Sequence, residues 1–170
     1  PLSLSGCLVD VAQTMQKFSN ERSCKEILSS IIAGEIYTSA ILEPSNQDPE
    51  NPMTTATIEN DQLIISGTKY LSEISSIAKS ILISVNSSEG VLLVLVESDK
   101  VKLTELASTA NSPLFKVELD SVRISRESII HEQGRGLEAL RYLIQINMVM
   151  RSYIALGITE KMTSLVAGYT

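Results

Sequence analysis

The spacing of apolar residues divides the chain into three parts, of which the first is helical. Between residues 7 and 32, apolar side chains recur near helical spacing, and a polar stretch at residues 19–22 interrupts them. This spacing predicts two helices, or one broken helix, ended by Gly34. The apolar positions are Leu8, Val11, Met15, Phe18, Ile27, Leu28, Ile31 and Ile32.

The middle part, residues 37–132, consists of short β-prone segments between turn-forming residues. Asn60 and Asp61 predict a hairpin turn, and Gly67 allows a bend. The polar loop at residues 45–52 is long enough to be functional or mobile. Because no helical pattern separates the strands, an antiparallel sandwich or open barrel is favoured over a parallel α/β sheet. Strands are predicted at residues 37–41, 54–59, 63–66, 80–86, 91–97 and 116–124.

The last part follows residues 134–136 (GRG) and returns to a helical pattern without proline. It predicts one long helix of about 25 residues or more. Apolar side chains at residues 144–150 occupy nearly every side of this helix, so it needs helical neighbours in water. The expected fold class is α+β and multi-domain, with an antiparallel β-sandwich or open barrel flanked by an N-terminal helical segment and a long C-terminal helix. The expected domains are the end of a helical domain (1–36), a middle β-domain (37–132) and the start of a second helical domain (133–170).

Length and charge narrow the classes of function. A chain of 170 residues with 44% hydrophobic residues can bury a core. Its formal net charge of -6 argues against a nucleic acid or an anionic membrane surface as partner. Its apolar runs are far shorter than the roughly 20 residues that span a bilayer. Cys7 and Cys24 are expected to be free thiols of a reducing compartment, and the protein is expected to be cytoplasmic.

Two further signals allow a chemical or a structural interpretation. A Ser-His-Asp hydrolase would need His131, the single histidine, as its base, but the sequence has no Gly-x-Ser-x-Gly elbow. No second imidazole or nearby cysteine suggests a zinc site, so His131 is interpreted as a loop residue and no metal is expected. Residues 134–136 lack the third glycine of a dinucleotide fingerprint and the Lys-Ser/Thr ending of a phosphate loop, which favours a simple loop before a helix.

Several short strings, in the correct order over residues 25–170, resemble the acyl-CoA dehydrogenase family of flavoenzymes. Residues 33–35 (AGE) and 39–44 (SAILEP) are similar to the family's small-Gly-Glu turn and its Thr-Glu-Pro strand. Residues 55–56 (TA) and 66–72 (SGTKYLS) are similar to its Thr-x-Ala hairpin and its Gly-x-Lys-x-Trp-Ile-Thr segment. Further matches are residues 117–124 (VELDSVRI) to its closing strand, residues 129–136 (IIHEQGRG) to its Leu-Gly-x-x-Gly-x-Gly turn, and Arg151, Gly157 and Tyr169 to its first long C-terminal helix.

The resemblance implies an FAD site at two strand ends. A flavin ring needs an apolar or aromatic wall and hydrogen-bond donors at its polar edge. By resemblance, Tyr70 would stand beside the ring and Ser72 would offer a hydroxyl to its edge. Leu42 replaces the family's threonine and leaves only backbone groups there. The alternative is a half-buried strand aromatic at Tyr70 and a turn residue at Ser72. The implied cofactor-binding residues are Ile41, Leu42, Tyr70, Leu71 and Ser72.

The resemblance also implies an acyl-CoA substrate. Asp48 matches the family's loop aspartate if the loop is one residue shorter, and an Asx turn before Pro49 is the structural alternative. Arg151 lies on a largely apolar helix face, where its charge needs a carboxylate or a ligand anion as partner. Asp48 and Arg151 are therefore the candidate substrate-binding residues, with a structural ion pair as the alternative for Arg151.

No catalytic residue is assigned in this chain. The family's base is a glutamate in a late helix or just before the arginine of the first long C-terminal helix, and the residue before Arg151 is Met150. One hypothesis is therefore a partial or degenerate FAD-dependent oxidoreductase of fatty acid metabolism, which dehydrogenates acyl-CoA thioesters between the α and β carbons. The other is a non-catalytic scaffold or interaction module with the same β-domain. A homo-oligomer, either a dimer or a tetramer, is expected.

Overall fold

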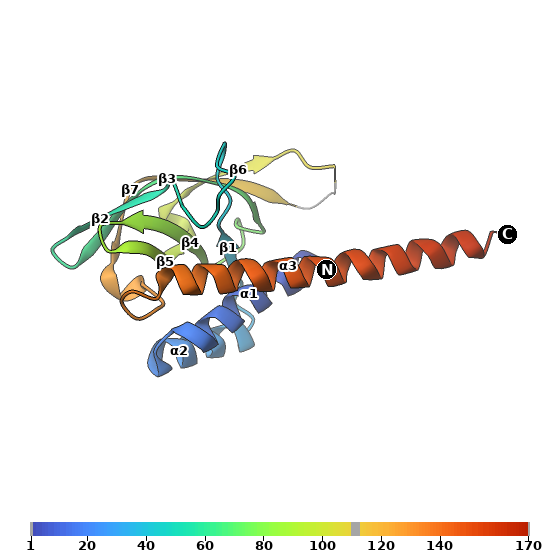
Figure 1. Cartoon of the computed structure of the whole chain (residues 1–170), viewed down its shortest axis with the longest axis horizontal. Helices are drawn as coiled ribbons and strands as arrows, with labels where there is room; N and C mark the ends of the chain where they lie inside the picture. The colour runs from blue at the N-terminus through green and yellow to red at the C-terminus, as the bar shows by residue number, and fades with distance from the viewer. Residues whose placement is uncertain (1, 110–112, 170) are drawn as a thin grey trace.

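The computed structural model describes residues 2–109 and 113–169. A curled sheet forms an open barrel, and the helices lie together on one side of it (Figure 1). Two shorter helices precede the sheet in the chain, and one long helix follows it. The expected α+β class, with a β-domain flanked by helical segments, is confirmed.

The first two helices are α1 (Leu2–Phe18) and α2 (Glu21–Ile32). The break predicted at residues 19–22 is confirmed, because the side chain of Asn20 caps α2 by accepting a hydrogen bond of 2.8 Å from the Ser23 N–H. Gly34 follows α2 with a φ of 96°, a left-handed backbone that favours glycine. The thiol of Cys24 is free, and the Cys7 side chain lies outside the described part of the chain.

One seven-stranded sheet contains all the strands of the described residues, in the order β1-β4-β2-β3-β7-β6, with β5 paired to β4 off this path. The sequence predicts six of these strands and misses β6, which lies at the end of the order against β7. The strands are β1 (Tyr37–Ala40), β2 (Thr55–Glu59), β3 (Gln62–Glu73), β4 (Ser80–Ser87), β5 (Gly90–Glu97), β6 (Lys102–Leu106) and β7 (Leu114–Ser125), with short 3-10 helices η1 (Ser98–Lys100) and η2 (Arg126–Ser128).

The open barrel is confirmed, but two of the strand pairs are parallel rather than antiparallel. β1 pairs in parallel with the first half of β4, and β2 pairs in parallel with its end. β1 and β2 therefore follow one another along a single edge of β4, whose other edge holds β5 in an antiparallel pair. A loop and the β2–β3 hairpin connect β1 to β4, so the parallel pairing arises without a crossover helix.

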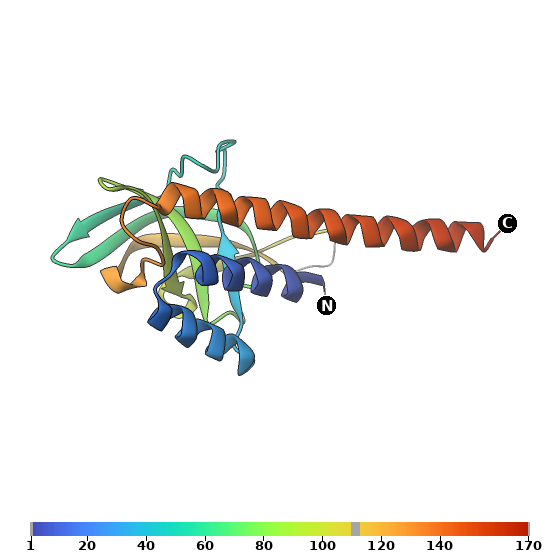
Figure 2. The same ribbon diagram turned by 60° about the horizontal axis from the view of Figure 1, so that its bottom comes forward.

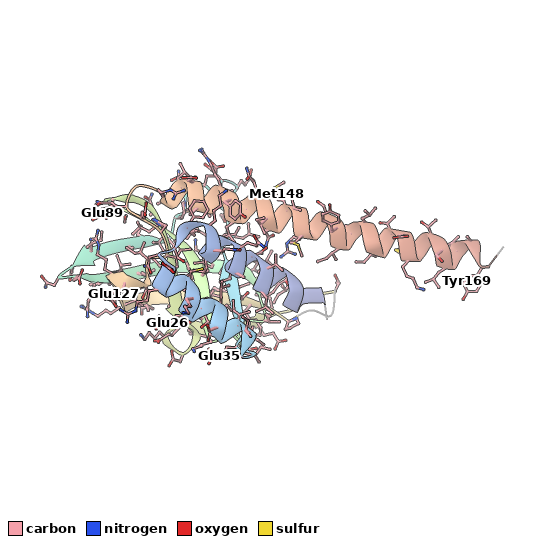
Figure 3. The ribbon with its side chains drawn as sticks, turned by 90° about the horizontal axis from the view of Figure 1, so that it is seen from below. Glu26, Glu35, Glu89, Glu127, Met148 and Tyr169 are labelled. Atoms are coloured by element: carbon pink, nitrogen blue, oxygen red, sulfur yellow. The ribbon has the colours of Figure 1, made fainter. Side chains whose placement is uncertain are left out.

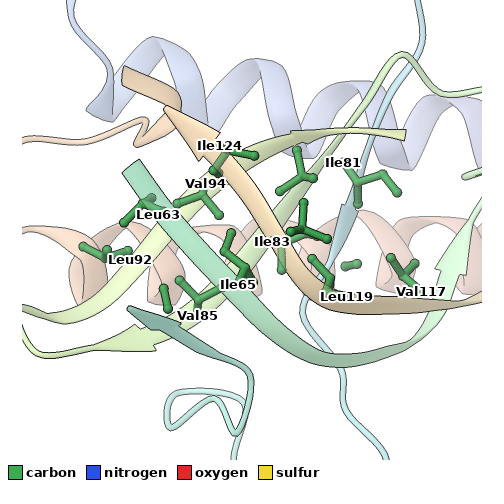
Figure 4. Packing of buried hydrophobic residues seen from close by; sticks show 14 residues of the cluster. Leu63, Ile65, Ile81, Ile83, Val85, Leu92, Val94, Val117, Leu119 and Ile124 are labelled. Atoms are coloured by element: carbon green, nitrogen blue, oxygen red, sulfur yellow. The ribbon is translucent and has the colours of Figure 1, made fainter. Parts of the chain in front are cut away.

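Both faces of β4 are covered, which explains its long apolar run. One face, with Ile81 and Ile83, joins the barrel core that Figure 4 shows between the crossing strands. The other face, with Leu82, lies under the helices together with Leu93 of β5. A strand buried on both faces loses the alternation of a half-exposed strand. The helix-side core also contains Val11, Met15, Phe18, Tyr37, Ile130, Ala139, Leu140 and Leu143.

The long helix α3 (Gly136–Ala167) confirms the predicted length. Its first turns pack on β5 and α1, where Ala139, Leu140 and Leu143 are buried. The rest of α3 continues past the domain into solvent (Figure 2), and its apolar side chains from Met148 onward are largely exposed (Figure 3). Despite this apolar character, none of the described helices meets the combination of length and hydropathy needed to cross a membrane.

Candidate functional site

A bulge in β3 shapes the end of the sheet where the sequence places its flavin-facing residues. The pairing of β3 with β7 shifts register between Lys69 and Ser72, and Leu71 has a φ of 56°. A left-handed backbone is uncommon for leucine and stores strain. The bulge leaves Tyr70 and Leu71 exposed by 36% and 43%, although both belong to a long central strand.

The chain just after β1 lies directly beside this bulge. The Tyr70 N–H donates a hydrogen bond of 2.8 Å to the carbonyl oxygen of Leu42, whose side chain is 44% exposed. The structure therefore brings together the two segments that contain the five candidate cofactor-binding residues. Leu42, Tyr70 and Leu71 present exposed apolar side chains there, and Ile41 is half-buried.

Ser72 lies in the same place but turns inward. Its Oγ donates a hydrogen bond of 3.1 Å to the carbonyl oxygen of Ser39 and accepts one of 2.7 Å from Ser75 Oγ. The side chain of Ser72 is buried, and its bond to Ser39 joins β3 to β1. In this arrangement the hydroxyl proton points into the protein.

A buried ion pair lies behind the exposed residues. Lys69 Nζ is 2.7 Å from Glu43 Oε1, and the side chains of Lys69 and Glu43 are only 0% and 3% exposed. Burial alone would raise the pKa of Glu43, but hydrogen bonds from Lys69, Thr54, Asn46 and the Met53 N–H lower it to about 2. Burial lowers the pKa of Lys69 to about 8, and the neighbouring Glu43 charge opposes that shift. At neutral pH both groups are charged.

Asp48 forms a turn within the loop between β1 and β2. Its Oδ1 accepts a hydrogen bond of 3.1 Å from the Glu50 N–H, and its own N–H donates one of 2.9 Å to Asn46 Oδ1. This is the Asx-type geometry of the structural alternative. Glu50 in turn pairs with Arg141 of α3 at 2.8 Å, so the loop is tied to that helix.

Arg151 joins α3 to the end of β3. Its Nη2 is 2.8 Å from Glu73 Oε1, and its Nε donates to Asn147 Oδ1 at 2.7 Å. Asn147 also donates to Asp10 of α1, whose second carboxylate oxygen is buried and has no hydrogen-bond partner among the described side chains and backbone. Burial raises the pKa of Asp10 to about 6, although the Asn147 hydrogen bond and the Arg151 charge both lower it. The guanidinium of Arg151 thus has the carboxylate partner that the sequence requires.

His131 has a structural role in this arrangement. Its Nε2 accepts a hydrogen bond of 3.1 Å from the Leu93 N–H, which assigns the proton to Nδ1, 2.8 Å from the Glu132 carbonyl oxygen. Burial lowers the pKa of His131, so the neutral ring is favoured. Within residues 2–109 and 113–169, no group of three or more His, Cys, Asp or Glu side chains could hold a metal ion.

Sequence reasoning missed Lys69, Glu43 and Asp10 as buried charges. The alternation of β3 contained a signal for the first, because Lys69 has the same parity as the core residues Leu63 and Ile65. Asp10 lies between Val9 and Val11 on the packed side of α1, where an unpaired carboxylate is unexpected. The pairing of Glu43 with Lys69 had no local signal, since the two residues lie on different segments.

Comparison with known proteins gives matches in structure alone. No family model matches the sequence, and no curated protein matches it either. An acyl-CoA dehydrogenase from Geobacillus kaustophilus has a TM-score of 0.75 and 18% identity, covering 94% of this chain and 48% of that one. A glutaryl-CoA dehydrogenase from Mycobacterium smegmatis in complex with FADH2 has a TM-score of 0.77 and 20% identity, with coverages of 85% and 39%.

A third match is a prolyl acyl carrier protein oxidase, with a TM-score of 0.79 and 20% identity over 86% of this chain and 42% of that one. This chain therefore spans less than half the length of the proteins that it matches. The described residues have the fold of the acyl-CoA dehydrogenases, over the middle β-domain and parts of the helical regions on either side of it.

Proposed function

We propose that this chain is the flavin-facing part of an FAD-dependent oxidoreductase of the acyl-CoA dehydrogenase type. The observation that carries the proposal is the β3 bulge, which turns Tyr70 and Leu71 outward beside Leu42. An aromatic ring and two leucines at adjoining strand ends make an apolar wall suited to a planar ring system. Bulges next to active sites commonly re-aim side chains in this way.

The residues present fit one wall of such a site. Tyr70 and Leu71 would cover the flavin ring, with Ile41 and Leu42 along its margin. A bound flavin would accept the hydride from the β-carbon of an acyl thioester. Ser72 would serve the flavin edge only by turning its hydroxyl proton away from the Ser39 carbonyl, which a hydroxyl rotor can do.

The acyl-CoA substrate belongs to the same proposal, with Asp48 and Arg151 as its candidate contacts. Arg151 would bind a substrate anion in exchange for Glu73, because the guanidinium already holds that carboxylate. Proton abstraction needs a base that Met150 cannot supply, since a thioether does not accept the α-proton. We therefore propose that turnover requires a carboxylate from outside this chain.

The protruding half of α3 favours a second candidate function, that of an assembly module. Five of its exposed apolar residues form a stripe with alternating spacings of three and four, which is the heptad repeat of paired helices. We propose that this stripe pairs with the same helix of a second copy, in a dimer or tetramer. The stripe consists of Ala155, Ile158, Met162, Leu165 and Tyr169.

Titration of the purified chain with FAD tests the flavin-facing role. We expect a yellow complex with flavin absorbance bands. Tyr70→Ala should weaken FAD binding about tenfold, because an aromatic contact is lost. The control is Tyr153→Ala, which removes an equally large side chain that is 69% exposed on α3 and lies outside the proposed stripe. A chain that stays colourless after FAD addition would favour the assembly module instead, and equal affinity in the two variants would reject Tyr70 as a contact.

A further inference from the structure

Glu43 is placed to control the geometry of the flavin-facing edge without being part of its surface. Glu43 follows Leu42 in the chain, and Lys69 precedes Tyr70. The ion pair between Glu43 and Lys69 therefore joins the two segments through the residues that directly neighbour Leu42 and Tyr70. The main-chain hydrogen bond between Tyr70 and Leu42 lies between the same two segments.

The two oxygens of Glu43 hold different parts of the protein. Oε1 accepts hydrogen bonds from Lys69 Nζ at 2.7 Å and from the N–H and Oγ1 of Thr54 at 2.8 and 2.6 Å. Oε2 accepts from Asn46 Nδ2 at 2.9 Å and from the Met53 N–H at 2.6 Å. Oε1 thus faces β3 and the start of β2, while Oε2 faces the loop that contains Asp48.

The backbone of β3 also approaches Thr54, one of the hydrogen-bond partners of Glu43, very closely. This is independent evidence that the positions of β3 and of the residues bound to Glu43 are tightly restricted. A Cβ atom on Gly67 would lie 2.7 Å from Thr54 Oγ1 and 2.8 Å from Thr54 Cα. Gly67 also has a φ of 153°, which favours glycine. Lys69 lies two residues further along and completes its contacts with Ser84 Oγ of β4 at 3.0 Å.

Stability alone is a weak reason for such a pair. Removing two charges from water costs several kcal/mol, and apolar residues of similar volume often stabilise a core equally well or better. A fully hydrogen-bonded buried pair does fix one arrangement of the segments it joins. Here those segments are the loop, the end of β1 and the bulged part of β3.

We propose that Glu43 is a positioning residue, which sets the spacing of Leu42 and Tyr70 at the flavin edge and couples that edge to the loop of residues 44–53. This inference rests on the proposed function. Its consequence is that FAD bound at the edge stabilises the loop, and that loosening the loop weakens FAD binding by the same factor.

The test compares four forms of the whole chain: the unaltered protein, Glu43→Gln, Asn46→Ala and the control Glu89→Gln. The control removes a charge from a partly exposed ion pair with Arg126 that is remote in sequence from both segments. FAD affinity, the visible flavin spectrum, far-UV circular dichroism and hydrogen exchange with and without FAD are measured for each form. Exchange of the Asn51 and Met53 amides reports on the loop, because these N–H groups bond to Asp48 and Glu43.

We expect Glu43→Gln to lower FAD affinity about tenfold and to shift the flavin bands, because a charged acceptor is lost behind Tyr70. In the unaltered chain FAD should slow hydrogen exchange of the Asn51 and Met53 amides. In Asn46→Ala the factor by which FAD slows this exchange should be about fivefold smaller. The control should match the unaltered chain in affinity, spectrum and exchange.

Three results would overturn the inference, and they are distinguishable. A folded Glu43→Gln variant with unchanged affinity and spectrum rejects the positioning role. If that variant does not fold, Asn46→Ala decides, since Asn46 lies outside the core and its side chain bonds to Glu43 and to Asn51 and Asp48 of the loop. Undiminished protection of the loop amides by FAD in this variant rejects the coupling. Failure of the unaltered chain to bind FAD overturns the proposed function, and the positioning role with it.

Discussion

The start of α3 allows a test of how closely this helix packs on strand β5. A Cβ atom on Gly136 would lie 1.7 Å from the carbonyl oxygen of Val91 and 2.9 Å from His131 Nε2. Ordinary contacts of a Cβ begin near 3.4 Å, and the nearest atom is backbone, so Gly136→Ala requires α3 and β5 to separate by more than about 1 Å. That movement would disturb Leu140 and Leu143, which are fully buried in the helix-side core.

Overpacking of this kind costs about 3 kcal/mol, and the gain in helix propensity from glycine to alanine returns less than about 1 kcal/mol at a helix end. For a domain of this size the melting temperature should fall by roughly 6 °C or more. Gly157→Ala is the matched control, because Gly157 lies in the same helix with open space where its Cβ would be. Thermal unfolding followed by circular dichroism would refute the reasoning if the two variants melted at the same temperature.

Two other predictions concern α1 and the far half of α3. The pKa of Asp10 is raised in the folded state from 3.8 to about 6, so its contribution to stability falls as pH rises from about 4 to 6 and stays low above that. The free energy of unfolding of Asp10→Asn should therefore exceed that of the unaltered chain by about 2 kcal/mol at pH 7 and equal it at pH 4. Urea titrations of both proteins at the two pH values measure this difference, and the same difference at both would contradict the prediction. Ile158→Glu with Leu165→Glu should abolish self-association in sedimentation, whereas Ser164→Glu on the opposite side of α3 should preserve it; a monomeric unaltered chain would reject the dimer.

The elements that follow from local pattern could be predicted from the sequence. The break at Asn20, the length of α3 and six of the strands have signals within a few residues of each other. The sequence pattern does not predict β6, because the side chains of this strand are exposed or half-buried and show little apolar alternation. The parallel pairing of β1 with β4 could not be predicted, because it depends on how the β2–β3 hairpin is placed between them.

Some features of the candidate site could likewise be predicted from the sequence, and others could not. Strings of sequence indicated that Leu42 and Tyr70 belong to one site, and the structure brings their segments into contact. The inward turn of the Ser72 hydroxyl depends on Ser39 and Ser75, which no sequence pattern links to it. The exposure of Leu71 depends on a local backbone bulge, and the buried charge of Glu43 on a partner from another strand.

The position of β4 between three partners has a consequence for the order in which the molecule assembles. β4 and β5 form a hairpin of neighbouring strands, so their pairing closes only a short loop. β1 pairs with β4 across a long intervening stretch of chain, and such distant contacts tend to form late and open early. The edge beside Leu42 should therefore close after the β4–β5 hairpin has formed. Native-state hydrogen exchange should find the amides of β1 less protected than those of β4 and β5, and equal protection would mean that the whole sheet forms as one unit.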